Sequence, residues 1–216
     1  MSTQANTFAS ERLHIGAEPD ALARIGKPGV ELAVWRRAAH AAWSPWLDAL
    51  APAQLPRLRT TLSVVEIVRA LHAACHAAGT PPGAARDAWV ADTAAQAYHF
   101  ARISRSARLR VRLDVVDDNG CRRLHRDCVP LRLLCTCRGP GTVWVKPNHA
   151  AQALAAADDY DGPLEHLAAH DVAIFKGCGF PGQQHDSGIV HRSPRIEGSG
   201  ITRLVLCLDP LPEPSA

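Results

Sequence analysis

Short apolar runs separated by turn residues follow one another through the second half of the chain, and this pattern restricts the folds open to it. Residues 108–113 alternate arginine with leucine or valine, which is the period of a strand with one face in water. Glycine, proline or Asn-Gly turn signals lie between most of the runs. An Ala-rich segment at 148–169 is predicted to interrupt them with a helix. Further strands are expected at residues 121–127, 129–137, 142–146, 171–176, 188–192 and 201–208, a number that favours a jelly roll or barrel.

The first half of the chain has helical periodicity instead. Residues 64–78 place apolar side chains at helical spacing up to Gly79, and residues 84–103 do the same after a Pro-Pro-Gly break. Shorter elements are expected before them, with helices at 20–25 and 36–50 and strands at 30–35 and 58–62.

The predicted fold class is therefore α+β. We expect a flexible arm over residues 1–17 and a mainly helical N-terminal region over 18–105. A double-stranded β-helix of jelly-roll, cupin-like type is expected to follow over 106–210.

Composition narrows the class of protein. A chain of 216 residues with 47% hydrophobic and 21% charged residues can form a sizeable core, which excludes global disorder. A net charge of +3 is too small to indicate nucleic acid by itself. Seven cysteines, an odd number without regular spacing, favour reduced thiols. With no secretory signal and no apolar run near the ~20 residues of a bilayer span, a soluble cytoplasmic protein is expected.

Two histidines, a carboxylate and an arginine form the candidate site. His125 and Asp127 lie two residues apart in a predicted strand, so their side chains are expected to share a face. His191, in a later strand, can supply a third ligand. Two histidines and one carboxylate around a metal with open positions form the facial triad of non-haem Fe(II) oxygenases. A lone His-x-Asp is nevertheless common by chance, and only the set of residues in order gives it weight.

Arg203 adds a positive charge on the strand after His191. Both faces of the predicted strand 201–208 are mainly apolar, so Arg203 is expected to point into apolar surroundings. A buried guanidinium needs an anionic partner. That partner is either a structural Asp or Glu, or the carboxylate of a small-molecule ligand held by two hydrogen bonds.

Cysteines supply a competing hypothesis for the metal. Together with His125 or His185 they could form a thiolate-rich zinc site in a non-enzymatic, metal-handling protein of cupin-like shape. Paired C-x-x-C spacing is lacking, and buried hydrophobes are a simpler interpretation of most of them. His72 and His76, one helical turn apart, lack the glutamate of an H-E-x-x-H motif and are interpreted as packing or surface residues. The cysteines in question are Cys128, Cys135, Cys137, Cys178 and Cys207.

A run of arginines between residues 102 and 112, with Arg122 and Arg123 nearby, forms a basic patch. It could guide RNA, DNA or an acidic substrate, but alternation of this kind is usually a solvated strand face. No aromatic residues interleave it, so nucleic acid is not the expected partner. Lys176, before a glycine-rich loop, is a candidate ligand contact, or a strand-end lysine pointing to water.

The ordered motifs resemble a bacterial family labelled domain of unknown function 1826. They are P-G-V-E-L-A-V-W-R-R, then L-H-R-D-C-V-P-L-R-L-L-C-T-C-R-G-P-G-T-V-W-V, D-V-A-I-F-K-G, I-V-H-R-S-P and R-L-V-L-C-L-D. The similarity covers most of the chain and brings no established activity. At the level of motifs alone, the chain is also similar to the Fe(II)/2-oxoglutarate dioxygenase superfamily.

This second resemblance implies roles for individual residues. His125, Asp127 and His191 would hold Fe(II), and Arg203 would bind the distal carboxylate of 2-oxoglutarate. Oxidation of a C–H bond in an unknown small-molecule or protein substrate would follow. Gly139, Gly141 and Thr142 would shape a turn near the metal, and Trp144 would wall the pocket, although a tight turn alone explains the glycines equally well.

Overall fold

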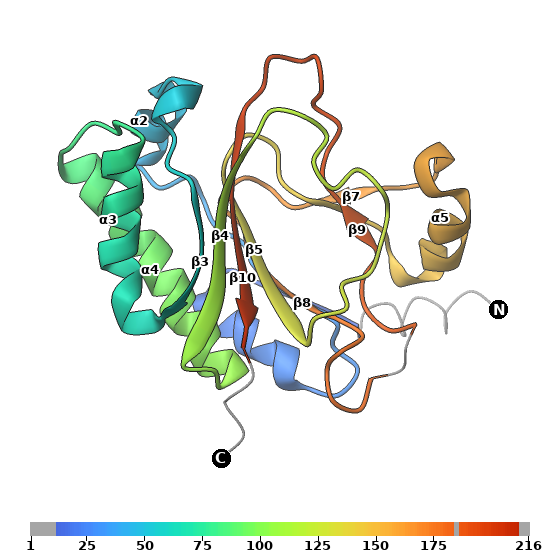
Figure 1. Ribbon diagram of the computed structural model, residues 1–216. Coiled ribbons are helices and arrows are strands. Elements are labelled where there is room, and N and C mark those ends of the chain that lie inside the picture. The colour runs from blue at the N-terminus through green and yellow to red at the C-terminus, as the bar shows by residue number, and fades with distance from the viewer. Residues whose placement is uncertain (1–11, 184–185, 212–216) are drawn as a thin grey trace.

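The computed structural model describes residues 12–183 and 186–211, and within them most strands belong to one large sheet (Figure 1). Only its edge pair, β1 and β2, is parallel, and every other neighbouring pair is antiparallel. In spatial order the seven strands are β1 (Leu13–Gly16), β2 (Leu32–Trp35), β8 (Val172–Lys176), β5 (Leu131–Arg138), β10 (Arg203–Pro210), β4 (Arg108–Val116) and β3 (Leu58–Ser63).

A smaller sheet packs against one end of the large one. Its three described strands are, in order, β7 (Glu165–His166), β6 (Val143–Trp144) and β9 (His191–Arg192). Trp144 and Ile189 from this sheet and its flank contact Phe175 of β8 in a buried apolar cluster. The two sheets therefore enclose a layer of apolar side chains between them.

Helices cover the opposite face of the large sheet. The α3 helix (Ile67–Ala77) follows a turn in which the Ser63 backbone N–H and hydroxyl both donate to Glu66, at 2.9 and 2.7 Å. The long α4 helix (Ala84–Ser104) ends where Arg105 adopts a left-handed conformation. The other helical segments are η1 (Pro19–Gly26), α2 (Ser44–Ala49), η2 (Pro52–Gln54), η3 (Val64–Glu66), η4 (Pro147–His149), α5 (Ala150–Ala156) and η5 (Ala157–Asp159).

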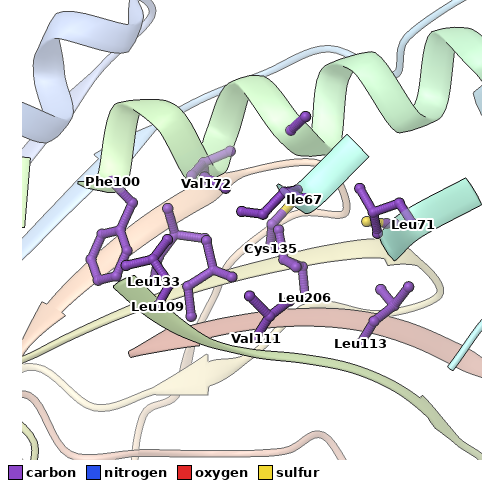
Figure 2. Close-up of a cluster of buried hydrophobic side chains, with 14 of the residues drawn as sticks. Ile67, Leu71, Phe100, Leu109, Val111, Leu113, Leu133, Cys135, Val172 and Leu206 are labelled. Atoms are coloured by element: carbon purple, nitrogen blue, oxygen red, sulfur yellow. The ribbon is translucent and has the colours of Figure 1, made fainter. Parts of the chain in front are cut away.

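The main core lies between α3, α4 and the large sheet. Alternate residues of β10, such as Leu204 and Leu206, are almost fully buried against these helices. Figure 2 shows Leu206 beside Val111 of β4 beneath the helices, with Ile67 of α3 directed towards the strands. Burying these leucines, valines and aromatic side chains is the main driving force for this arrangement.

The other face of the same strands is polar and faces a cavity. Arg203, Cys207 and Asp209 of β10 share this face, and Cys207 lies directly opposite Arg112 of β4. Arg203 was expected in apolar surroundings because its strand neighbours are leucine and valine. Arg203 is almost fully buried and only burial shifts its pKa, whereas the arginines and aspartates of the adjacent strands lie elsewhere on this side of the sheet.

The mixed α+β class and both long helices agree with the sequence analysis, but the N-terminal part is not a separate helical region. The β1, β2 and β3 strands belong to the large sheet, which joins residues before 64 to the C-terminal half. Residues 13–16 were expected in the flexible arm. They form β1 instead, next to an ion pair between Arg12 and Glu31, while residues 1–11 lie outside the described residues.

The predicted strand at 121–127 is also wrong. Only an isolated bridge at His125 forms there, because the segment crosses from the large sheet to the small one. Among the described residues, no helix is long and apolar enough to cross a membrane.

Candidate metal centre

His125, Asp127 and His191 meet at one point beside the cavity. One potential ligand atom from each lies within 4.8 Å of the others. The backbones of His125 and His191 exchange two hydrogen bonds, at 3.1 and 3.0 Å, which brings their rings to a centroid distance of 4.6 Å. Asp127 and His191 are buried, and His125 is partly exposed. His125 and His191, 66 positions apart in the chain, are thus joined by a single antiparallel bridge.

Backbone carbonyls orient both imidazole rings. Nδ1 of His191 lies 2.9 Å from the Ile189 carbonyl oxygen, and Nδ1 of His125 lies 2.9 Å from that of Arg123. A carbonyl oxygen only accepts, so each Nδ1 carries the hydrogen and each Nε2 carries the free lone pair. Metal-bound histidines are usually fixed in this way. The two Nε2 atoms lie 3.9 Å (His125) and 3.4 Å (His191) from oxygens of Asp127.

The Asp127 carboxylate has one occupied and one open oxygen. Its Oδ1 accepts a hydrogen bond from the Arg132 guanidinium. Its Oδ2 is buried and has no hydrogen-bond partner. A buried carboxylate oxygen without a partner is costly. A cation between Oδ2 and the two Nε2 atoms would satisfy it, so the three residues fit a divalent metal.

The electrostatic surroundings favour the neutral form of His191. Burial lowers the pKa of His191, and the nearby Asp127 opposes this only in part. Neutral imidazole is the form that binds metals. The thiol of Cys121, 3.7 Å from Nε2 of His125, raises the pKa of His125 by hydrogen bonding, although burial opposes the rise.

Arg203 lies on the same cavity and has no acidic partner among the described residues. Its Nε donates to the carbonyl oxygen of Pro140 at 2.7 Å, and a terminal nitrogen donates to the Thr136 hydroxyl at 3.3 Å. Only 2% of the residue is exposed. Burial lowers the pKa of Arg203 to about 10, so it remains charged at neutral pH. The sequence left two possible partners for Arg203, a structural Asp or Glu and the carboxylate of a ligand. Among the described residues, no Asp or Glu pairs with it.

The cavity that joins these groups has a volume of about 380 Å³. His125 and His191 line it near one wall, and Arg203 and Thr142 line it as well. Thr142 therefore lies at the wall of the cavity that the histidines line. The volume is sufficient for a small dicarboxylic acid together with part of a second molecule.

Trp144 and Lys176, the two other pocket candidates, lie elsewhere. Trp144 is buried in the apolar cluster between the two sheets and does not line the cavity. Lys176 is buried too. Its ammonium group donates to the Lys27 carbonyl oxygen at 3.3 Å and lies over the Phe180 ring. Their sequence positions next to strand ends did not reveal which face each side chain takes.

The Gly-Pro-Gly turn after β5 supports Arg203 rather than the metal. Gly139 has a φ of 80°, and a Cβ there would lie 3.0 Å from Cγ of Arg203. A Cβ at Gly141 would lie only 2.0 Å from the Leu167 carbonyl oxygen. Both glycines are therefore required because other atoms lie where a Cβ would be. The tight turn expected from the sequence is not the only reason for them.

The structure does not gather the cysteines into a zinc site. Cys135 and Cys137 face the helices, whereas Cys207 faces the cavity, where the Arg112 guanidinium lies 2.8 Å from its sulfur. Within residues 12–183 and 186–211, the His-Asp-His group alone has metal-binding geometry, and His72 and His76 take no part in it. His185 lies outside the described residues.

Arg132, Asp209 and Thr136 are functional candidates that the sequence analysis missed. Arg132 joins Asp127 to Asp209, whose carboxylate it contacts through Nε at 2.7 Å and a terminal nitrogen at 3.1 Å. Thr136 supports Arg203. The signal was present in β5, where Arg132 and Thr136 occupy alternate positions among buried apolar residues and must face away from the core.

The comparison with protein families identifies the chain. The family model described as "Protein of unknown function (DUF1826)" matches residues 16–209, so the chain belongs to that family. A search of curated proteins found no match.

Solved structures similar to this one include two dioxygenases for auxin oxidation and a prolyl-4-hydroxylase. The rice dioxygenase for auxin oxidation is 15% identical, with a TM-score of 0.44 over 97% of this chain and 79% of that one. The Arabidopsis thaliana dioxygenase for auxin oxidation 1, in its 2-oxoglutarate complex, is 12% identical, with a TM-score of 0.38 over 75% of this chain and 65% of that one. A Pseudomonas putida prolyl-4-hydroxylase is 14% identical, with a TM-score of 0.36 over 76% of this chain and 95% of that one.

Proposed function

We propose that this protein is an Fe(II)- and 2-oxoglutarate-dependent dioxygenase that oxidises a C–H bond of its substrate. The observation that carries the proposal is the convergence of His125, Asp127 and His191, with one oxygen of Asp127 buried and unpartnered. Two imidazoles and a carboxylate are the protein ligands of the non-haem Fe(II) oxygenases. In this proposal the two facing sheets form a double-stranded β-helix.

Arg203 supports 2-oxoglutarate as the co-substrate. A buried guanidinium without an acidic partner favours a bound carboxylate, which it can hold through two parallel hydrogen bonds. Pro140 and Thr136 fix the guanidinium from behind, and the fork is then oriented before the ligand arrives. In the proposed complex Arg203 holds the distal carboxylate, and the 2-oxo acid end lies towards the triad.

Other residues of the chain would orient the metal ligands. Iron with 2-oxoglutarate would supply O₂-dependent oxidation of a C–H bond, with succinate and CO₂ as co-products. The carbonyl groups of Ile189 and Arg123 keep the lone pair of each Nε2 directed at the metal position. Arg132 holds the Asp127 carboxylate so that Oδ2 stays available.

Anaerobic spectroscopy tests the proposal directly. Adding Fe(II) and then 2-oxoglutarate to the metal-free protein should produce the weak visible charge-transfer band of a chelated 2-oxo acid. Arg203→Ala should need far more 2-oxoglutarate for the same band while binding iron as the wild type does. Arg69→Ala, an exposed arginine on α3, is the matched control and should leave both quantities unchanged. Stoichiometric iron without a band, or loss of iron in Arg203→Ala, would contradict the proposal.

A non-enzymatic zinc protein is the second candidate, because the same donor atoms suit Zn²⁺. It predicts that one zinc ion remains bound after dialysis and that Fe(II) with 2-oxoglutarate gives no band.

We further propose a cytoplasmic location, since all seven cysteines are free and a reducing compartment would keep them so.

A further inference from the structure

Three arginines lie side by side on the cavity face of the large sheet. Arg59 of β3 is directly opposite Arg112 of β4, and Arg110 is two residues away on the same face of β4. With Arg132 they line a second cavity of about 420 Å³. Arg59, Arg112 and Arg132 also line the cavity of the metal triad, so the two cavities adjoin. We call this second cavity the arginine groove.

Arg132 is the arginine of the groove whose charge is fully compensated. It bonds to Asp127 on one side and to both oxygens of Asp209 on the other. Its role is to hold these carboxylates in place beside the triad. It therefore contributes little attraction for a ligand.

The other three guanidiniums are poorly compensated. Arg112 comes within 3.5 Å of an Asp209 oxygen that Arg132 already uses, and its Nε is buried without a partner. Arg59 pairs with Asp114 at 3.1 Å in an exposed position, where such a pair is weak. Arg110 forms no ion pair with any carboxylate of the described residues. Like charges directly opposite each other on neighbouring strands, as in Arg59 and Arg112, destabilise a sheet.

The charge of the groove points to a dianion. Four guanidiniums face one lining carboxylate, Asp209, and the partner of Arg59 adds a second. Two positive charges remain, because Asp127 does not line the groove. A phosphate monoester neutralises two charges and accepts several charge-assisted hydrogen bonds from guanidinium groups. A single carboxylate would leave one charge unbalanced.

We infer that the arginine groove binds the phosphate group of the substrate, so that this oxygenase acts on a small phosphate-bearing molecule. That the phosphate-bearing molecule is the substrate rests on the proposed function, whereas the binding of an anion in the groove does not. Arg59, Arg110 and Arg112 hold the phosphate, and the rest of the molecule extends into the adjoining cavity towards the triad. Neither cavity has a Phe, Tyr or Trp in its lining, so a nucleic-acid strand would find no stacking surface.

Calorimetric titration of the metal-free full-length protein with inorganic phosphate tests this inference. At a pH well above 7 phosphate is a dianion, and ionic strength is held constant. Arg110→Gln and Arg59→Gln should each weaken phosphate binding about tenfold, because each removes one charged donor. Arg69→Gln on α3 removes the same charge from a distant exposed site and should bind phosphate as the wild type does. Thermal unfolding of each variant verifies that it is folded.

Several outcomes would overturn the inference. Equal phosphate affinity in Arg110→Gln and Arg69→Gln would place the anion elsewhere. Acetate binding as tightly as phosphate would remove the preference for a dianion. Binding of an oligonucleotide with a steep salt dependence, without binding of phosphate, would indicate nucleic acid instead.

A second measurement separates this inference from the proposed function. In protein loaded with Fe(II) and 2-oxoglutarate without O₂, phosphate should shift the charge-transfer band of the wild type but not that of Arg110→Gln. Phosphate and 2-oxoglutarate should bind together without competition, because Arg203 is not part of the groove. If no band forms, the proposed function fails. If the band forms and phosphate does not bind in the groove, only the substrate class fails.

Discussion

Nε2 of His191 lies 3.4 Å from an Asp127 oxygen that accepts no hydrogen bond. This separation is too long for a good hydrogen bond. It is suitable for two atoms that share a third partner between them. The other Asp127 oxygen is held by Arg132, so the carboxylate cannot turn freely to satisfy both oxygens. This geometry fits a cation held between Oδ2 of Asp127 and Nε2 of His191.

Replacing Asp127 with Asn is expected to abolish metal binding at this centre. The change keeps the shape of the side chain but removes the negative charge that a divalent ion requires. Titration with Mn(II) or Fe(II) should raise the melting temperature of the wild type, because a ligand that binds only the folded state stabilises it. The same titration should leave Asp127→Asn unchanged.

The metal-free Asp127→Asn protein should also lose about 1–3 kcal/mol of unfolding free energy, measured in urea, because Arg132 loses one of its two carboxylates. Asp87→Asn, at an exposed helical position, is the control and should keep the metal effect. Metal-dependent stabilisation that survives in Asp127→Asn would show that the ion binds elsewhere.

Gly139→Ala is expected to weaken 2-oxoglutarate binding without removing the metal. The added Cβ would lie 3.0 Å from Cγ of Arg203 and would push the guanidinium away from Thr136. The concentration of 2-oxoglutarate that half-saturates the charge-transfer band should rise about tenfold, as expected when one charge-assisted contact is lost.

Gly198→Ala separates this effect from backbone strain. Gly198 has a φ of 74°, close to the 80° of Gly139, but a Cβ there would meet nothing within 4 Å. Both variants should lose about 1–2 kcal/mol of stability from the left-handed conformation. If both also weakened 2-oxoglutarate binding equally, the contact with Arg203 would not be the cause.

His170 is expected to make stability depend on pH. Burial, and secondarily the charge of Arg37, lowers the pKa of His170 in the folded protein, whereas the unfolded chain has the ordinary value near 6.5. The unfolded state therefore binds more protons below that value. This contribution to stability is complete above pH ~6.5 and is lost as the pH falls through the lower folded-state pKa.

His170→Asn should reduce this acid sensitivity. Asn tolerates the left-handed conformation at this position, where φ is 72°, although it loses the edge-on contact with Trp43. Unfolding in urea at pH 5 to 8 should give a shallower curve for the variant than for the wild type. Parallel curves would assign the acid sensitivity to other groups, such as His191.

The sequence predicted the elements whose residues follow one clear period. The alternation of arginine with leucine and valine in β4 and the apolar spacing in α4 each determine one buried face, and both elements formed near the predicted bounds. Similarly, the order of residues along the chain pointed to His125, Asp127 and His191, which converge, while Arg203 lines the adjoining cavity.

The sequence did not show which distant segments of the chain contact each face of a strand. Arg203 is buried, as its apolar strand suggested, but the groups that hold it, Pro140 and Thr136, come from the neighbouring strand and the turn after it. His125 looked like part of a strand because its neighbours alternate, yet it is held by one bridge to residue 191. Contacts between distant segments decide both cases, and a local pattern does not encode them.

Adjacent residues of β10 are expected to differ in what they support. Leu206 is 1% exposed and packs against α3, α4 and the neighbouring strands (Figure 2), so Leu206→Ala should cost about 2–5 kcal/mol in urea unfolding. Val205 is half-buried on the cavity face, and Val205→Ala should cost about 1 kcal/mol or less. At a temperature where both variants are folded, Leu206→Ala should keep the wild-type affinity for 2-oxoglutarate, whereas Val205→Ala should change it, because Val205 lines the cavity. Equal stability losses for the two variants would mean that the cavity face is packed as tightly as the core, which would leave no room for a ligand beside Arg203.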